Sequence, residues 1–107
     1  MGAKQRVKKQ GGQQHDRDTH LVQSALAARF PSIESYRSPY GTLRVRIVDE
    51  RFAKKNRVQR EKSVLPLIRN LPEEIQSEIV MLVLLAPGEQ DASAQNLEFE
   101  HPRRKVV

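Results

Sequence analysis

Basic side chains gather in one stretch of the sequence, and the chemistry open to them is the neutralisation of phosphates. Between residues 44 and 69 nine Lys and Arg accompany three Asp and Glu, a net charge of +6 that equals the net charge of the 107-residue chain. Such a density is typical of surfaces that contact nucleic-acid backbones with little sequence preference. The residues that we expect to bind nucleic acid or another anion are Arg44, Arg46, Lys54, Lys55, Arg57, Arg60 and Lys62. The alternative is a solvated basic face that keeps a small domain soluble.

A second group of polar residues has the chemistry of metal ligands. His15, Asp16, Asp18 and His20 follow one another closely near the start of the sequence. Imidazole and carboxylate groups bind zinc or nickel, but a site needs three or four ligands held in place. Ordering a flexible arm around a metal is costly. We therefore predict no metal site and no cofactor.

The sequence shows no arrangement of catalytic residues. The chain has no Cys, which excludes thiol catalysis, disulfides and an iron–sulfur cluster held by the chain's own thiolates. Asp49 and Glu50 are adjacent and would point in opposite directions on a strand, which is poor geometry for acid–base catalysis. No Ser–His–Asp pattern, phosphate-binding loop or dinucleotide fingerprint is present. We predict that the protein is not an enzyme.

The sequence also lacks the long apolar segments that mark membrane proteins and secreted proteins. No apolar run approaches the roughly 20 residues of a membrane span. The first 20 residues are polar and contain no apolar core of a secretory signal. These features predict a cytoplasmic protein without membrane association.

Hydrophobic periodicity predicts the elements that must position the cations. Val22, Leu26 and Phe30 recur at intervals of four residues, which predicts an amphipathic helix that ends at Pro31. A short alternating run over residues 33–36 predicts an edge strand.

The clearest strand covers residues 42–48, where apolar residues alternate strictly with polar ones. Its apolar residues share one face, and Arg44 and Arg46 share the other. We expect the apolar face to pack on the core and the two arginines to face water or a partner.

Two helical segments and a last strand follow. Residues 56–71 have helical spacing with Pro66 inside, so either a kinked helix begins near residue 56 or a regular one begins near Ser63. Residues 71–75 predict a second short helix with a proline in its first turn. Residues 79–85 are apolar on both faces, which is typical of a buried strand.

These elements predict one α+β domain over residues 19–88. The order α-β-β-α-β gives a two-layer sandwich whose three-stranded mixed sheet carries helices on one face. Residues 1–18 are predicted to be a disordered basic arm, and residues 89–107 a disordered C-terminal tail, because both are polar.

The stretch Arg46–Val64 resembles the BolA-like family, whose domain is related to the type II KH fold. Phe52, Lys55 and Arg60 match the family's Phe, the Lys of its Gly-Lys pair and an Arg that precedes its helix. The last strand and the Pro-containing turn after it also fit. The resemblance implies a regulatory or interaction module that pairs with a monothiol glutaredoxin and shares an iron–sulfur cluster with it.

Three positions depart from the BolA-like pattern. Val80 stands where the family has its cluster-ligating His, Glu61 stands in place of the His of an Arg-His-Arg motif, and Lys54 replaces a Gly. Valine has no lone pair to offer to iron, so the usual cluster ligation is lost. We therefore expect a non-enzymatic module, with a monothiol glutaredoxin as candidate partner.

The alternative to this reading is a nucleic-acid-binding domain that uses the basic face around residues 44–62 for DNA or RNA. The sequence has no Gly-X-X-Gly, the loop with which KH modules clamp an RNA backbone. Its absence counts against KH-type recognition and leaves contacts to phosphates as the remaining mode.

Overall fold

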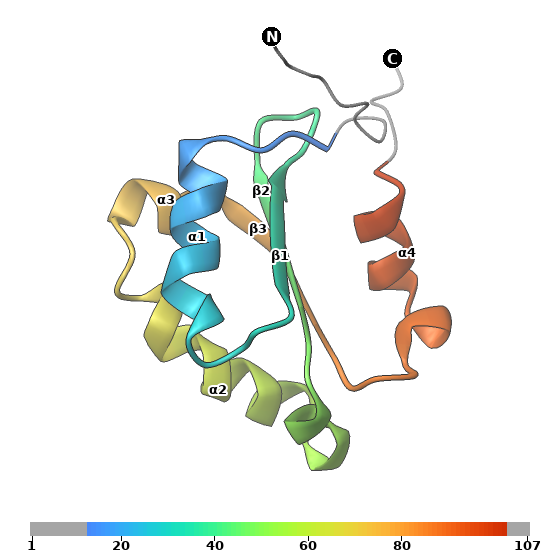
Figure 1. The fold of residues 1–107 in the computed structure, drawn as a ribbon. Coiled ribbons are helices and arrows are strands. Elements are labelled where there is room, and N and C mark those ends of the chain that lie inside the picture. The colour runs from blue at the N-terminus through green and yellow to red at the C-terminus, as the bar shows by residue number, and fades with distance from the viewer. Residues whose placement is uncertain (1–12, 103–107) are drawn as a thin grey trace, which may run out of the picture.

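The computed structural model describes residues 13–102, in which a three-stranded sheet lies between two groups of helices (Figure 1). The elements along the chain are α1 (Arg17–Ala27), β1 (Ile33–Arg37), β2 (Leu43–Val48), the 3-10 helix η1 (Glu50–Lys54), α2 (Arg57–Ile68), α3 (Glu73–Glu78), β3 (Ile79–Leu85), the 3-10 helix η2 (Gln90–Ala92) and α4 (Ala94–Glu100). None of the helices in the described residues has the length and apolar character needed to cross a membrane. The predicted α+β class is confirmed.

The sheet has the order β1-β2-β3, with β2 in the centre. β1 and β2 are antiparallel, and the turn between them contains Gly41 at a φ of 88°, which a residue with a side chain rarely adopts. β2 and β3 are parallel, with Val45 opposite Leu82. The mixed three-stranded sheet is therefore as predicted.

Reciprocal capping fixes where the two longer helices begin. The Asp16 carboxylate accepts a hydrogen bond from the Thr19 amide at 3.0 Å, and the Thr19 hydroxyl accepts one from the Asp16 amide at 2.9 Å. Asn56 and Gln59 form the same pair at the start of α2. The helix begins at the earlier of the two predicted positions, directly after Asn56, and therefore contains Pro66.

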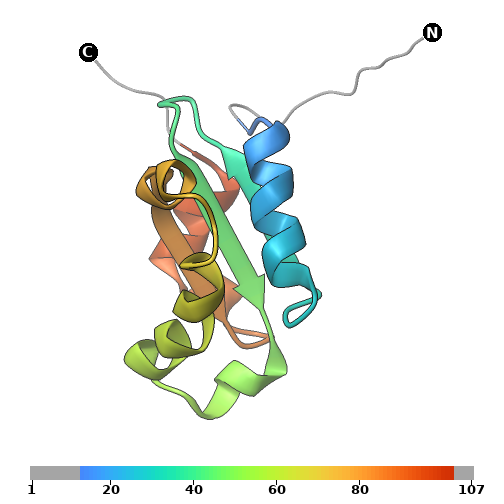
Figure 2. The same cartoon turned by 90° about the vertical axis from the view of Figure 1, so that its left-hand side faces the viewer.

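One face of the sheet packs against α1, α2 and α3, which lie in front of the sheet in Figure 2 with α4 behind it. The apolar stripe of α1 and the apolar side of β2 meet here as predicted. This core consists of Val22, Leu26, Phe30, Ile33, Leu43, Val45, Ile47, Phe52, Val64, Ile68, Leu71, Ile75, Leu84 and Ala86. Burial of these side chains is the main source of the domain's stability.

The other face of the sheet is covered by α4, which corrects two predictions. Helices were expected on one face only, and residues 89–107 were expected to be disordered, yet η2 and α4 form within this segment. Phe99 of α4 packs with Tyr36, Val83 and Leu85 in a second apolar cluster. Residues 90–100 are ordered because the partners of α4 lie on the sheet, far away in the sequence.

The end of the predicted basic arm is part of the folded domain. Gln14 forms a bridge with Arg37 of β1, with backbone hydrogen bonds of 3.1 and 2.6 Å, and Asp16 caps α1. Residues 13–18 therefore belong to the domain. The remainder of the predicted arm, residues 1–12, and the end of the predicted tail, residues 103–107, lie outside the described residues.

Candidate interaction groove along strand β3

Arg44, which was expected to face water, lies beneath α4. Only 7% of the residue is exposed. Its Nη1 donates to the Glu98 carboxylate at 3.2 Å and to the Glu98 carbonyl oxygen at 3.3 Å. Its Nε is buried and has no hydrogen-bond partner in the described part of the chain. The expectation that this arginine meets solvent is wrong, because α4 covers its side of the sheet.

Arg46 lies in the same interface. Its guanidinium donates to the Asn96 side-chain oxygen at 2.7 Å and to the Glu100 carboxylate at 2.6 Å, and also forms a two-pronged pair with Glu34. The guanidinium carbon lies 4.8 Å from the centre of the Phe99 ring, a cation–π contact. Arg46 thus joins α4 to β1 and β2 and is not available to a phosphate.

The other five predicted cations lie at the end of η1, directly after it and in α2. Lys54, Arg57 and Lys62 are exposed and Lys55 is half-buried. Arg60 is turned inward, where it pairs with Glu89. The structure therefore does not bring all seven predicted residues onto one surface, since two lie on the α4 side of the sheet and a third is engaged internally.

The Arg60–Glu89 pair closes the end of β3. Arg60 donates to both oxygens of Glu89 at 2.7 and 3.0 Å, and to the carbonyl oxygen of Leu84 at 2.9 Å. Glu89 also accepts from the amide of Ala86 at 3.0 Å. These hydrogen bonds from Arg60 and Ala86 lower the pKa of Glu89 from its ordinary 4.5 to about 2. The pair therefore occupies backbone groups that another strand would need.

We expect the Glu89 carboxylate to stabilise the fold above pH 4.5 and to lose this effect as the pH falls toward 2, because its pKa is lower in the folded state. The side chain is 39% exposed, so solvent screening limits the effect to about 1 kcal/mol. Urea unfolding of the wild type and of Glu89→Gln should show a stability difference near neutral pH that shrinks near pH 2. A difference that is the same at both pH values would contradict this role.

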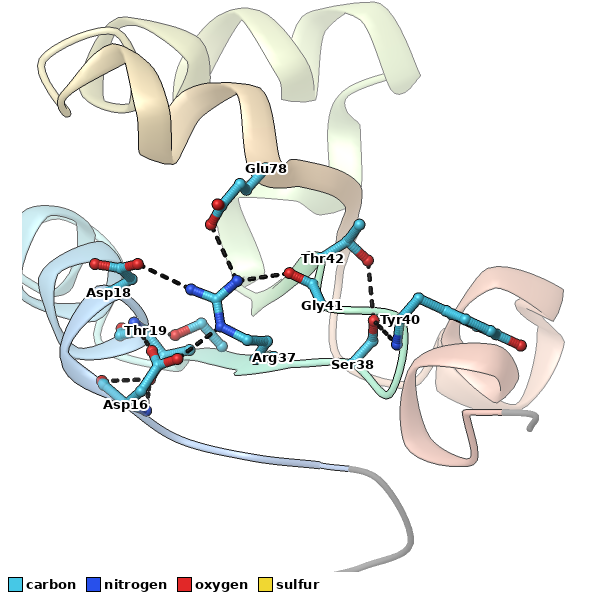
Figure 3. Close-up of polar contacts among 10 residues, drawn as sticks. Asp16, Asp18, Thr19, Arg37, Ser38, Tyr40, Gly41, Thr42 and Glu78 are labelled. Atoms are coloured by element: carbon cyan, nitrogen blue, oxygen red, sulfur yellow. Dashed lines mark hydrogen bonds and ion pairs between the residues drawn. The ribbon is translucent and has the colours of Figure 1, made fainter. Parts of the chain in front are cut away.

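Two members of the second group of predicted polar residues, Asp16 and Asp18, bind Arg37 (Figure 3), whereas His15 and His20 are exposed. Arg37 donates to Asp16 at 2.6 Å, to Asp18 at 2.9 Å, to Glu78 at 3.0 Å and to the Gly41 carbonyl oxygen at 2.6 Å. Burial tends to raise the pKa of Asp16, but the hydrogen bonds from Arg37 and from a backbone amide outweigh it and lower this pKa. No group of three metal-ligating side chains occurs in the described residues. The cluster joins α1, the β1–β2 turn and α3.

An open groove lies between α2 and β3. Its volume is about 410 Å³, within the range of ligand pockets in proteins. Its lining residues are Arg57, Glu61, Leu65, Ile68, Arg69, Gln76, Ile79, Val80, Met81, Leu82 and Gln95. A smaller hollow of about 170 Å³ continues it toward Arg60 and Leu84. The groove therefore runs along the side of β3 that faces away from β2.

Val80 is the most exposed apolar residue of this groove, at 61%. It is the extra residue of a β-bulge, since Leu43 lies opposite Ile79 and Arg44 lies opposite Met81. The sequence predicts a buried strand over residues 79–85. The strand is confirmed, but only residues 83–85 are buried, while Ile79, Met81 and Leu82 are half-buried and Val80 is exposed. The number of predicted strands indicates that edge strands exist, because an open sheet of three strands leaves two of them with one neighbour each.

The groove does not fit the iron–sulfur cluster that the BolA-like resemblance implies. Val80, which the resemblance places where the family has its ligand, lines the groove together with Glu61. The lining residues include one carboxylate but no imidazole and no thiolate, and iron–sulfur clusters are held mainly by thiolate, with histidine in some. The lining of this groove therefore offers no usual ligand for such a cluster.

A comparison with family models, with curated proteins and with solved structures found no match to this chain. The site is therefore defined by its own geometry. It combines the outer edge of β3, with which no strand pairs within residues 13–102, an exposed valine, and two arginines on the facing helix and at its C-terminal end.

Proposed function

We propose that the protein is a non-enzymatic interaction module of BolA type that binds a partner protein along the groove between α2 and β3. The observation that carries this proposal is the outer edge of β3. Within residues 13–102 no strand pairs with it, and Val80 is exposed beside an open groove. Exposed strand edges are sites at which proteins add a partner's chain.

The resemblance to BolA-like proteins supports a monothiol glutaredoxin as the candidate partner. In that family the partner is bound near the position of Val80. Because neither Val80 nor Glu61 ligates iron in the family's manner, the proposed complex relies on surface contact, and any cluster is held by the glutaredoxin alone. The role we propose is therefore regulation by binding and not cluster transfer.

Nucleic-acid binding has less support. A phosphate-binding face needs several cations that are free to release their counterions. Arg44, Arg46 and Arg60 are already paired with carboxylates of this chain. Fewer cations are accessible than the sequence predicts: Lys54, Arg57 and Lys62 are exposed, and Lys55 is half-buried.

We expect Val80→Glu to weaken binding to a monothiol glutaredoxin at least tenfold, because it replaces the exposed apolar side chain of the groove with a charged one. Tenfold corresponds to about 1.4 kcal/mol, well within the cost of burying a charge without a partner. Isothermal titration of the two purified proteins measures this. The matched control is Val58→Glu, since Val58 is 59% exposed, lies on α2 and is not a lining residue.

The visible absorption of the mixture should be that of the glutaredoxin's own cluster. A new cluster spectrum in the mixture would contradict the proposed loss of ligation. Equal weakening by Val80→Glu and Val58→Glu, or no complex at all, would contradict glutaredoxin binding in the groove.

A further inference from the structure

We infer that the groove accepts an extended acidic segment of a partner, which adds as a short strand beside Leu82. This inference rests on the proposed function and specifies what the partner presents. It is carried by three features of the described residues, which are the backbone groups at the edge of β3, the caps at the two ends of that edge and the charges on the groove wall.

The direction of the backbone groups follows from two observed hydrogen bonds. The carbonyl oxygen of Leu85 accepts from the amide of Asp49 on the β2 side, whereas the carbonyl oxygen of Leu84 accepts from Arg60 on the outer side. Successive residues of a strand present their N–H and C=O groups to alternate sides. The N–H and C=O of Leu82 therefore point outward into the groove, where they can pair with an added strand.

Both ends of this edge are closed, so the added strand is short. Toward the C-terminus, Arg60 occupies the Leu84 carbonyl and Glu89 occupies the Ala86 amide. Toward the N-terminus, the bulge at Val80 interrupts the regular spacing of backbone groups. What remains is the opening around Leu82, with Val80 as an apolar contact for a side chain of the bound segment.

The charges on the groove wall favour an acidic segment. Arg57 and Arg69 line the groove together with a single acid, Glu61. The Arg57–Glu61 pair is a surface pair at 3.5 Å with Arg57 78% exposed, and such pairs contribute only about 0.3–0.5 kcal/mol. Arg57 can therefore exchange Glu61 for a carboxylate of the partner at little cost.

The same charges disfavour the chain's own ends as occupants. Residues 1–12 contain four Lys and Arg and no acid, and residues 103–107 contain three Lys and Arg and no acid. A basic segment would meet Arg57 and Arg69 with like charge. An acidic partner is the occupant that complements this wall.

The test uses the full chain and fluorescence anisotropy with labelled synthetic peptides. The probe is a short peptide of alternating glutamate and valine. A second peptide has lysine in place of glutamate, and a third is the acidic peptide N-methylated on alternate amides, which keeps the side chains and removes the strand's hydrogen bonds. We expect the acidic peptide to bind at least tenfold more tightly than either of the others. The N-methylated peptide loses backbone hydrogen bonds, each worth about tenfold or less, and the lysine peptide meets Arg57 and Arg69 with like charge.

Charge reversal of the wall provides the decisive variant. The double substitution Arg57→Glu and Arg69→Glu should reverse the preference, so that the lysine peptide binds more tightly than the glutamate peptide. The control pair, Arg17→Glu and Arg29→Glu, reverses two exposed cations of α1 and its C-terminal end and should leave the preference unchanged. Both variants keep their core residues, and circular dichroism checks that they are folded.

Each contrary result has a distinct meaning. Equal affinity of the N-methylated peptide would overturn strand addition, and an unchanged preference in the Arg57/Arg69 variant would overturn the role of charge. Self-association that Val80→Glu abolishes would make a second copy of the chain the occupant and overturn the inference. If no peptide binds but the glutaredoxin does, the inference is overturned and the proposed function stands. If the acidic peptide binds but the glutaredoxin does not, the inference stands and glutaredoxin is not the partner.

Discussion

Arg44→Glu is expected to destabilise the domain by about 3–5 kcal/mol, the usual cost of leaving a buried charge without its partner. Arg44 is almost fully covered by α4, and its guanidinium faces the Glu98 carboxylate at 3.2 Å. Glutamate would place a second carboxylate against Glu98 where water cannot solvate it. Since small domains are stable by only about 5–15 kcal/mol, we expect α4 to detach or the whole chain to unfold.

Urea unfolding followed by circular dichroism measures this effect. The matched control is Arg57→Glu, the same substitution at an exposed position with a weak surface pair, which should change the free energy of unfolding by no more than about 0.5 kcal/mol. Similar stabilities for the two variants would mean that α4 does not cover Arg44 in solution.

Phe99→Ala is expected to cost about 3–5 kcal/mol, as truncation of a buried phenylalanine commonly does. The Phe99 ring packs against Tyr36 with ring centres 4.8 Å apart and lies under the Arg46 guanidinium. Its carbonyl oxygen also accepts a hydrogen bond from the Tyr36 hydroxyl. Without the ring, α4 loses the apolar contact that holds it on the sheet.

Hydrogen exchange locates this change within the molecule. In Phe99→Ala the amides of α4 should lose protection, and those of α1 should keep it, because α1 packs on the opposite face. Leu97→Ala is the control, since Leu97 lies on the same helix and is 62% exposed. A uniform loss of protection across the chain would contradict this prediction, because it would show that the elements on the two faces of the sheet unfold together.

The parts of the fold that could be predicted are those with a periodic apolar pattern. The stripe of α1 and the alternation in β2 identify which side chains enter the core, and both are buried as expected. The crossover through α2 predicts that β2 and β3 are parallel. In each case the signal lies within one segment or between neighbours in the chain.

Helix α4 could not be predicted in the same way. It is short, and only Asn96 and Phe99 of its residues are buried. It is held on the sheet by the Phe99 contacts and by ion pairs with Arg44 and Arg46, which lie more than 50 residues earlier in the sequence. When the contact between α4 and β2 is not known, the two arginines are interpreted as a solvent-exposed basic face and the acidic residues of α4 as part of a solvated tail.

The candidate site could be predicted only in part. The sequence identified Arg57 as an exposed cation, but it did not identify the groove, because apolar periodicity reports on the faces of a sheet and says nothing about its edges. Val80 was singled out through the BolA-like resemblance and not through its exposure. Arg69 was counted among the basic residues, but no pattern placed it beside β3.

The bulge at Val80 and the Arg60–Glu89 cap together affect how this molecule behaves in a concentrated solution. Fibril growth needs a continuous ladder of backbone groups to which copy after copy can add. Here the ladder on the outer side of β3 is interrupted at one end and blocked at the other. The domain can therefore present an apolar strand to a passing partner while offering no long template for stacking, and removing the cap with Arg60→Ala would lengthen that template.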